Sequence, residues 1–255
     1  MRTLDIHWPD LPKGVGVLST LRSGGVSTGA YADAGGGGGL NLGTHVGDAP
    51  EAVAENRALL RSLLPANPIW LEQVHGNEVV NAQNHLTGDA APRADAIMAT
   101  AGGTVCPIMT ADCMPVLLAD SRGNLVAAAH AGWRGLASGV IQNTVKQLQE
   151  AGADEILAWL GPSIGPERFE VGEDVLAAFQ HLGPAAKSAF VAVAVAGKPG
   201  KYLANLPVLA RLVLASVGVV QVAGGDRCTV SEASEFYSYR RDRVTGRMAT
   251  MIWIK

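Results

Sequence analysis

Short apolar runs and helically spaced apolar residues occur side by side along this chain. The runs at residues 15–21, 69–75, 103–109, 155–160 and 248–254 predict strands. The periodic segments at 50–64, 131–148, 172–180 and 203–216 predict helices. The sequence contains no repeat of fixed period and no linker-like stretch between separate units. We therefore expect strands and helices to mix within one domain that covers residues 1–255.

The middle of the chain predicts a β-hairpin with chemical groups at its open end. Two apolar runs flank residues 120–123, an Asp-Ser-Arg-Gly sequence that favours a turn. If Ala119 pairs with Asn124, Cys113 lies directly opposite His130. Opposed residues on one face of an antiparallel pair have Cβ atoms about 4.5–5.5 Å apart. The pairing of the thiol with the imidazole depends on this register, because a one-residue slip moves side chains to the other face.

Composition and charge exclude several functional classes. The 255 residues suffice for one large domain, and the net charge of −3 gives no electrostatic reason to expect nucleic acid. No apolar run reaches the roughly 18 residues of a membrane span, and the N-terminus lacks the apolar core of a signal peptide. Three cysteines indicate a reducing compartment without a disulfide framework. We expect a cytoplasmic protein that binds neither nucleic acid nor membrane.

Three side chains offer ligands for a metal ion: His75, Cys113 and His130. Zinc accepts two imidazoles and a thiolate, and three protein ligands leave the open position of a catalytic site. The sequence has neither a CxxC nor an HExxH spacing. A Cys113–His130 nucleophile–base pair would require the same proximity, so the predicted hairpin leaves both interpretations open.

Two arginines lie where an anion could bind. Arg22 stands beside two glycines in the polar segment 22–27, which we expect to be a flexible loop. Arg134 follows His130 at the expected start of a helix, where free N–H groups favour an anion. Asn41 and His45 occur among small residues and could line a site.

The chain resembles the YfiH-type family of purine nucleoside phosphorylases, which is also known as the laccase-domain or polyphenol oxidase family. The resemblance extends from end to end and rests on seven motifs: Arg-Ser-Gly-Gly-Val-Ser at 22–27, Leu-Asn-Leu-Gly-Thr-His at 40–45, Trp-Leu-Glu-Gln-Val-His-Gly at 70–76, Thr-Ala-Asp-Cys-Met-Pro at 110–115, His-Ala-Gly-Trp-Arg-Gly at 130–135, Phe-Glu-Val-Gly at 169–172 and Ser-Tyr-Arg-Arg-Asp at 238–242.

The resemblance implies an α+β fold, a layered α/β/β/α sandwich with mixed sheets. It implies a zinc enzyme that phosphorolyses adenosine, inosine and S-methyl-5′-thioadenosine, and that also deaminates adenosine. The family's ligands, two histidines and one cysteine, fall on His75, Cys113 and His130. Its partners would be a purine nucleoside and inorganic phosphate, and we expect a monomer or a weak homodimer.

This chemistry assigns further roles. Metal-bound water can attack purine C6 in deamination, and a nearby carboxylate moves the protons; Asp112 and Glu72 are the candidates. Phosphorolysis requires phosphate aligned against the ribose C1′. The guanidinium candidates for binding that phosphate are Arg22, Arg134 and Arg240. Asn41 and His45 could bind ribose or base.

Three other functions are compatible with the same residues. A metal-independent hydrolase or amidase would use Cys113 as nucleophile and His130 as base. A copper-dependent polyphenol oxidase could hold one copper ion, although the sequence lacks the many histidines of a multicopper enzyme. A non-enzymatic metal-binding partner would bind zinc without turnover.

Overall fold

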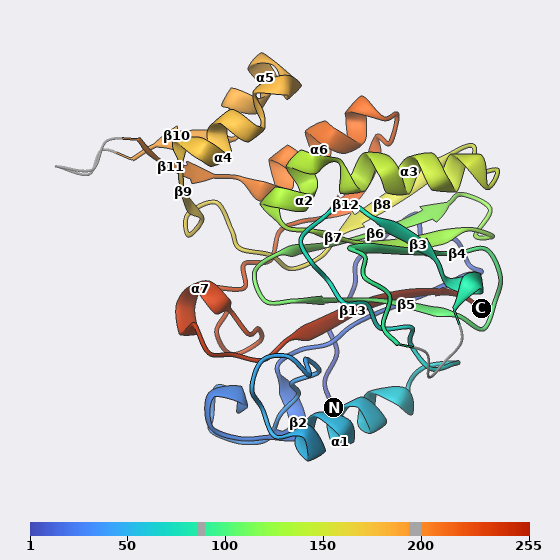
Figure 1. The fold of residues 1–255 in the computed structure, drawn as a ribbon, viewed down its shortest axis with the longest axis vertical. Coiled ribbons are helices and arrows are strands. Elements are labelled where there is room, and N and C mark those ends of the chain that lie inside the picture. Colours follow the sequence, from blue (N-terminus) through green and yellow to red (C-terminus); the bar gives the residue numbers. More distant parts are fainter. Residues whose placement is uncertain (86–89, 194–199) are drawn as a thin grey trace.

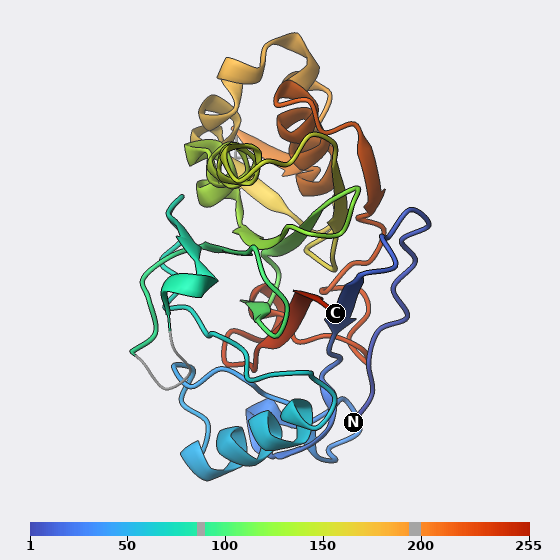
Figure 2. The same ribbon diagram turned by 90° about the vertical axis from the view of Figure 1, so that its right-hand side faces the viewer.

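Two β-sheets stacked face to face form the centre of the protein, and helices cover both outer faces (Figure 1). The structure, a computed structural model, describes residues 1–85, 90–193 and 200–255. Turned by 90°, it shows α3 and α6 above the sheets and α1 below them (Figure 2). The layers therefore follow the order α/β/β/α, as the family resemblance implied, and the predicted fold class is confirmed.

The elements have these bounds. The strands are β1 (Val15–Ser19), β2 (Ser23–Ser27), β3 (Val79–Asn81), β4 (Ala96–Ala99), β5 (Val105–Thr110), β6 (Met114–Asp120), β7 (Val126–Ala131), β8 (Ile156–Leu160), β9 (Glu170–Gly172), β10 (Phe190–Ala192), β11 (Lys201–Ala204), β12 (Gln221–Gly224) and β13 (Met248–Ile254). The α-helices are α1 (Pro50–Arg61), α2 (Trp133–Ser138), α3 (Val140–Glu150), α4 (Glu173–Ala178), α5 (Pro184–Lys187), α6 (Leu206–Ser216) and α7 (Tyr239–Asp242). Short 3-10 helices span Gly29–Tyr31, Ala82–Asn84 and Gln180–Leu182.

The larger sheet has six strands in the order β12-β8-β6-β7-β4-β3. Its two outer pairs, β12 with β8 and β3 with β4, are parallel, and the inner pairs are antiparallel. Every residue of β6 and β7 is buried, which explains why both strands read as continuous apolar runs. The smaller sheets, β1-β13-β5 and β10-β11-β9, are antiparallel.

Alternation along β6 separates the two main parts of the core. Val116 and Leu118 pack with the helices α3 and α6, whereas Leu117 packs with residues of the second sheet such as Ile108. This alternation follows from the two-residue period of a strand. The opposite face of the second sheet packs against α1 through Leu60.

The predicted hairpin forms, but its register differs from the expected one by two residues. Ala119 pairs with Val126, and Pro115, rather than Cys113, lies opposite His130. The turn still has four residues but lies at 121–124, because the backbone N–H of Asp120 donates to the carbonyl oxygen of Leu125 and the Asp120 carboxylate accepts from the N–H groups of residues 124 and 125. A shift of two residues preserves the face on which each side chain lies. Cys113 therefore stays on the face of His130, one step beyond the start of β6.

Three local predictions were wrong. Residues 69–75 contain one isolated bridge, Glu72 with Arg93, rather than a strand. Residues 23–27 form β2 rather than a flexible loop. The helix expected at 131–148 is divided into α2 and α3 by Gly139, whose φ of 98° interrupts the helical backbone. No helix in the described part of the chain has the length and apolar character to cross a membrane.

Candidate active site

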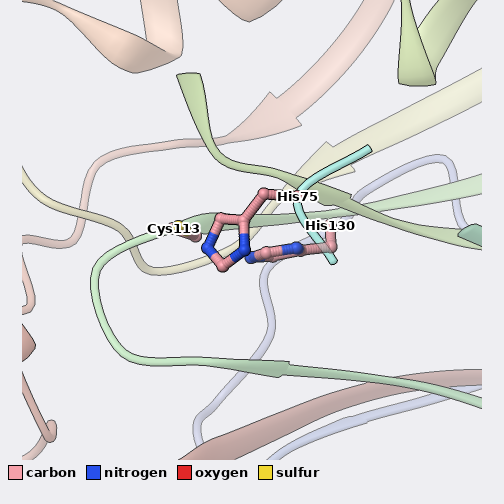
Figure 3. A group of neighbouring side chains, drawn as sticks. All are labelled: His75, Cys113 and His130. Carbon is pink, nitrogen blue, oxygen red and sulfur yellow. The ribbon is translucent and has the colours of Figure 1, made fainter. Parts of the chain in front are cut away.

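His75, Cys113 and His130 come together at one edge of the stacked sheets. Their potential ligand atoms all lie within 4.8 Å of one another. Figure 3 shows the three side chains pointing toward one another. Cys113 lies where the chain passes from β5 of one sheet to β6 of the other, His130 near the end of β7, and His75 in the loop before β3. The two imidazole rings meet edge to face, with centroids 4.8 Å apart.

Asp95 orients the His130 ring of this cluster through a hydrogen bond. It is fully buried directly before β4, and its Oδ1 lies 2.8 Å from Nδ1 of His130. Hydrogen bonds from His130 and from the backbone of Gly76 and Val74 outweigh the effect of burial and lower the pKa of Asp95. An ionised Asp95 accepts the Nδ1–H of His130, so the other ring nitrogen, Nε2, remains as the coordinating atom. Asp95 was not predicted from the sequence; a carboxylate within the apolar segment 93–98 was the available signal.

Cys113 and His130 strongly influence each other's protonation. Burial alone would raise the pKa of Cys113, but the charge of His130 and hydrogen bonds from both histidines bring it down to about 6. Burial would lower the pKa of His130, whereas the Cys113 thiolate and Asp95 raise it to about 9. A thiolate facing an imidazolium is therefore the expected state of the metal-free cluster at neutral pH. Either a metal ion or a nucleophilic reaction requires that thiolate.

Two glycines allow the chain to pass close to the cluster. A Cβ atom at Gly132 would lie 2.8 Å from Sγ of Cys113, closer than side chains tolerate. A Cβ atom at Gly135 would lie 2.9 Å from the carbonyl oxygen of Gly76. Gly132 links β7 to α2 and Gly135 lies in the first turn of α2, so this part of the chain packs directly against the candidate ligands.

The donor set fits a single metal ion. Among residues 1–85, 90–193 and 200–255, His75, Cys113 and His130 make up the one group of metal-binding type that the structure brings together. The imidazole of His130 is oriented by a carboxylate, as is usual for zinc-binding histidines. Two nitrogens and one sulfur would suit a tetrahedral ion that keeps one position free for another ligand.

The cluster opens into a cavity of about 540 Å³. This volume falls within the range of small-molecule sites, roughly 300–1,000 Å³. The lining combines apolar and aromatic side chains with basic ones: His45, Gln73, His75, Met109, Thr110, Ala111, Asp112, Cys113, His130, Gly132, Trp133, Arg134, Ile164, Phe169, Leu206, Tyr239, Arg240, Arg243 and Arg247. Among these lining residues, four are arginines and one, Asp112, carries a carboxylate, so the cavity favours an anionic ligand.

The four arginines are held in different ways. Arg240 lies over the ring of Phe169, and its Nη1 donates to the carbonyl oxygens of residues 168 and 170 at 3.3 and 3.1 Å. Arg134 stacks on Trp133 and Arg243 on Tyr239. Burial lowers the pKa of Arg247, whose Nη1 donates to the carbonyl oxygens of the two preceding residues. Arg243 and Arg247 were not predicted as site residues; the basic and aromatic character of 236–247 was the signal that could have found them.

Asp112 joins three segments around the cavity. Its Oδ1 accepts from the Thr229 hydroxyl and its Oδ2 from the backbone N–H of Arg240, each at 2.6 Å. Its own carbonyl oxygen accepts from the N–H of Ile164 at 2.9 Å. Asp112 also adopts a φ of 93°, a left-handed conformation that a non-glycine residue rarely takes. The carboxylate therefore fixes the start of α7, and with it Arg240, at the rim of the site.

Arg22, Asn41 and Glu72 are not among the residues that line the cavity. The Arg22 guanidinium is buried and donates to the carbonyl oxygens of residues 32 and 233. Asn41 is buried, where its amide links residues 43, 48 and 247. Glu72 is exposed and pairs with Arg93 at 3.3 Å. Each of these side chains supports a loop rather than facing the space that a substrate would occupy.

His45 does line the cavity. Partial burial lowers its pKa, and the nearby positive charges of Arg247 and Arg57 lower it further. Its imidazole is therefore neutral at pH 7, with one nitrogen that donates and one that accepts a hydrogen bond.

Comparisons with known proteins give one consistent result. A family model described as "Multi-copper polyphenol oxidoreductase laccase" matches residues 16–255. The Escherichia coli K12 protein named purine nucleoside phosphorylase YfiH is 50% identical over 97% of each chain. A Pseudomonas aeruginosa protein, also named as a purine nucleoside phosphorylase, is 48% identical, and its alignment covers 97% of this chain and 96% of its own. The crystal structure of Neisseria meningitidis protein NMB0706 superposes with a TM-score of 0.89, at 47% identity over 99% of each chain.

Proposed function

Because this chain belongs to the laccase-like family that includes YfiH, we propose that it is a metal-dependent purine nucleoside phosphorylase. The relatives from Escherichia coli and Pseudomonas aeruginosa both carry the name purine nucleoside phosphorylase. The observation that supports this function best is the His75–Cys113–His130 cluster in a cavity lined by four arginines. Such a cavity offers a metal ligand set beside a binding site for an anion.

The proposed reaction exchanges one bond at the ribose C1′. An oxygen of inorganic phosphate bonds to C1′, the C1′–N9 bond breaks, and its electron pair and a proton go to the purine. The nucleoside is uncharged and does not repel phosphate, so the protein must mainly hold phosphate in line and assist the departing base. We assign phosphate to Arg240 and Arg134, because arginine binds phosphate through paired, charge-assisted hydrogen bonds.

The other lining residues suit the nucleoside. Phe169 and Tyr239 provide aromatic surfaces for a purine, and neutral His45 can hydrogen-bond to ribose or base. We assign Asp112 to positioning Arg240, since both of its carboxylate oxygens already accept hydrogen bonds. The substrates we propose are adenosine, inosine and S-methyl-5′-thioadenosine.

Zinc is the metal we propose for the cluster. The donor set matches zinc, and the described residues form one such group rather than the several that a multicopper enzyme requires. Bound there, zinc would supply a Lewis acid and lower the pKa of a coordinated water, the chemistry needed for adenosine deamination as a second activity. His75, Cys113 and His130 would hold the ion, and Asp95 would keep Nε2 of His130 directed at it.

A product analysis tests the proposal directly. Purified protein of known zinc content is incubated with adenosine, with and without phosphate, and the products are separated by chromatography. Adenine that forms only with phosphate demonstrates phosphorolysis, whereas inosine demonstrates deamination. Unchanged adenosine, with inosine and S-methyl-5′-thioadenosine also unchanged, would refute the proposed enzyme activity.

The metal-free cluster also supports a second candidate function. The lowered pKa of Cys113, about 6, gives a thiolate beside an imidazolium, as in thiol hydrolases and amidases. That enzyme would be inactivated by thiol alkylation and would be indifferent to chelators. The proposed phosphorylase would instead lose activity with a chelator and regain it when zinc is restored.

The setting we propose is the cytoplasm. All three cysteines are free, and a thiol at a metal centre is best preserved in a reducing compartment.

A further inference from the structure

Asp95 contacts both histidines of the cluster. Its Oδ1 lies 2.8 Å from Nδ1 of His130 and accepts a hydrogen bond from the backbone N–H of His75 at 2.9 Å. Its Oδ2 accepts from the N–H groups of Val74 and Gly76 at 3.1 and 2.6 Å. Three consecutive backbone N–H groups therefore converge on one buried carboxylate that also orients a ring on a different element.

The turn at His75 needs such support. His75 has a φ of 60°, in the left-handed region that residues with a Cβ atom seldom occupy. Its side chain is exposed, so burial of the ring does not hold it in place. The convergence of residues 74–76 on Asp95 is what fixes this turn, and the turn directs the His75 ring toward Cys113 (Figure 3).

Asp95 is itself rigidly placed. Its backbone N–H donates to the carbonyl oxygen of Glu78, and its carbonyl oxygen accepts from the N–H of His130 at 2.7 Å. The carboxylate is thus attached to the same sheet that carries His130, and it links that sheet to the loop that carries His75.

We propose that Asp95 is the positioning residue that sets both histidines of the centre before a metal ion binds. The inference rests on the proposed metal centre but not on phosphorylase activity. Without Asp95, the His130 ring loses the partner that fixes its orientation, and the His75 turn loses all three of its carboxylate contacts. Partners of this kind typically contribute 10- to 100-fold to metal affinity.

The test compares zinc affinity in three proteins by competition with a chromophoric chelator. In Asp95→Asn, an amide NH2 at the Oδ2 position faces the N–H groups of Val74 and Gly76, and both hydrogen bonds are lost. An NH2 at the Oδ1 position loses the hydrogen bond from His75 and donates to Nδ1 of His130, which leaves the proton on Nε2, the coordinating atom. We expect zinc to bind about 10- to 100-fold more weakly. The cobalt(II) derivative should also show a changed d–d absorption, a signature that reports ligand geometry. The matched control is Asp120→Asn, which alters a buried carboxylate that accepts backbone N–H groups at the far end of β6.

The zinc affinities of Asp95→Asn and of the control Asp120→Asn decide whether the inference holds. Normal zinc affinity and an unchanged cobalt spectrum in Asp95→Asn would overturn the inference. Equal weakening in both variants would also overturn it, because the effect would then be general destabilisation. If wild-type protein binds no zinc, the proposed metal centre fails and this inference fails with it, whatever the product analysis shows.

Hydrogen exchange provides a test that needs no variant. In metal-free wild-type protein, the amides of His75 and Gly76 should exchange slowly although the His75 side chain is exposed, because Asp95 already holds them. Rapid exchange that slows only when zinc is added would mean that the metal sets the turn. That result would refute the role of Asp95 even if Asp95→Asn fails to fold.

Discussion

Gly132 offers the sharpest test of the cluster geometry. Its backbone angles, φ −63° and ψ 160°, suit any residue, so Gly132→Ala introduces no backbone strain. The added methyl group would lie 2.8 Å from Sγ of Cys113, but 3.5 Å from Cβ of Cys113 and 3.7 Å from Cδ2 of His75. Ordinary contact distances are about 3.5–4.0 Å, so only the sulfur is too close. The sulfur must therefore leave its position in the cluster.

The size of the effect follows from this overlap. Adding one methyl group to a tightly packed site costs about 1–3 kcal/mol. If that cost is borne by the metal-bound state, zinc affinity falls about 5- to 150-fold. The metal-free fold should be nearly unaffected, because the short Cys113 side chain can rotate when no ion holds it.

The assay is zinc competition together with thermal unfolding of the metal-free protein. Gly102→Ala serves as control, because a methyl group there would meet its nearest atoms at 3.6 and 3.7 Å and its φ is not left-handed. We expect weaker zinc binding with an unchanged melting temperature in Gly132→Ala, and neither change in Gly102→Ala. Wild-type zinc affinity in Gly132→Ala would refute the placement of Cys113 as a ligand.

Further predictions concern the same site. Cys113→Ala should abolish both zinc binding and activity, whereas Cys106→Ala, at a buried thiol whose pKa is raised by burial, should retain both; metal analysis and product chromatography distinguish them. In metal-free protein the alkylation rate of Cys113 should rise with pH around 6, in line with its lowered pKa. The lowered pKa of Cys113 raises the free energy of unfolding as pH rises from about 6 to 9, whereas the raised pKa of His130 lowers it between about 6.5 and 9. The two effects oppose each other, so the free energy of unfolding of metal-free protein, measured by urea denaturation, should change little across that interval. A steep dependence on pH would contradict the pairing of the Cys113 thiolate with the His130 imidazolium. Arg240→Ala should raise the KM for phosphate about 10- to 100-fold, the loss expected for charge-assisted hydrogen bonds. Asp112→Asn should act in the same direction, and a fall in kcat with unchanged phosphate KM would instead make Asp112 a proton donor or acceptor.

Much of the secondary structure could be predicted from the order of residues. β13 (Met248–Ile254) has the bounds expected from its apolar run, and β8 and α6 lie within their predicted segments. The hairpin of β6 and β7 was predicted with the wrong register, because the turn lies at 121–124, where the Asp120 carboxylate accepts from the backbone N–H groups of residues 124 and 125. That capping contact depends on one side-chain conformation and cannot be read from residue types alone.

The candidate site was also predicted only in part. The resemblance grouped His75, Cys113 and His130, and the structure brings their ligand atoms together. Asp95 was not predicted, since a single acidic residue before a short strand has no characteristic spacing from the three ligand residues. Arg22 was predicted at the phosphate, although its guanidinium is buried, donates to two carbonyl oxygens and is not among the residues that line the cavity.

The sequence by itself determined which segments become strands or helices, because those preferences depend on neighbours a few residues away. It also determined the kinds of side chain available for chemistry and, through its motifs, the family. The tertiary structure alone decided that β5 and β6 lie in different sheets, so that Cys113 sits in the crossover between them. It likewise decided that residues 74–76 converge on Asp95 and that the C-terminal arginines reach the cavity. These contacts join residues far apart in the chain, and only the packing of the folded layers specifies their distances.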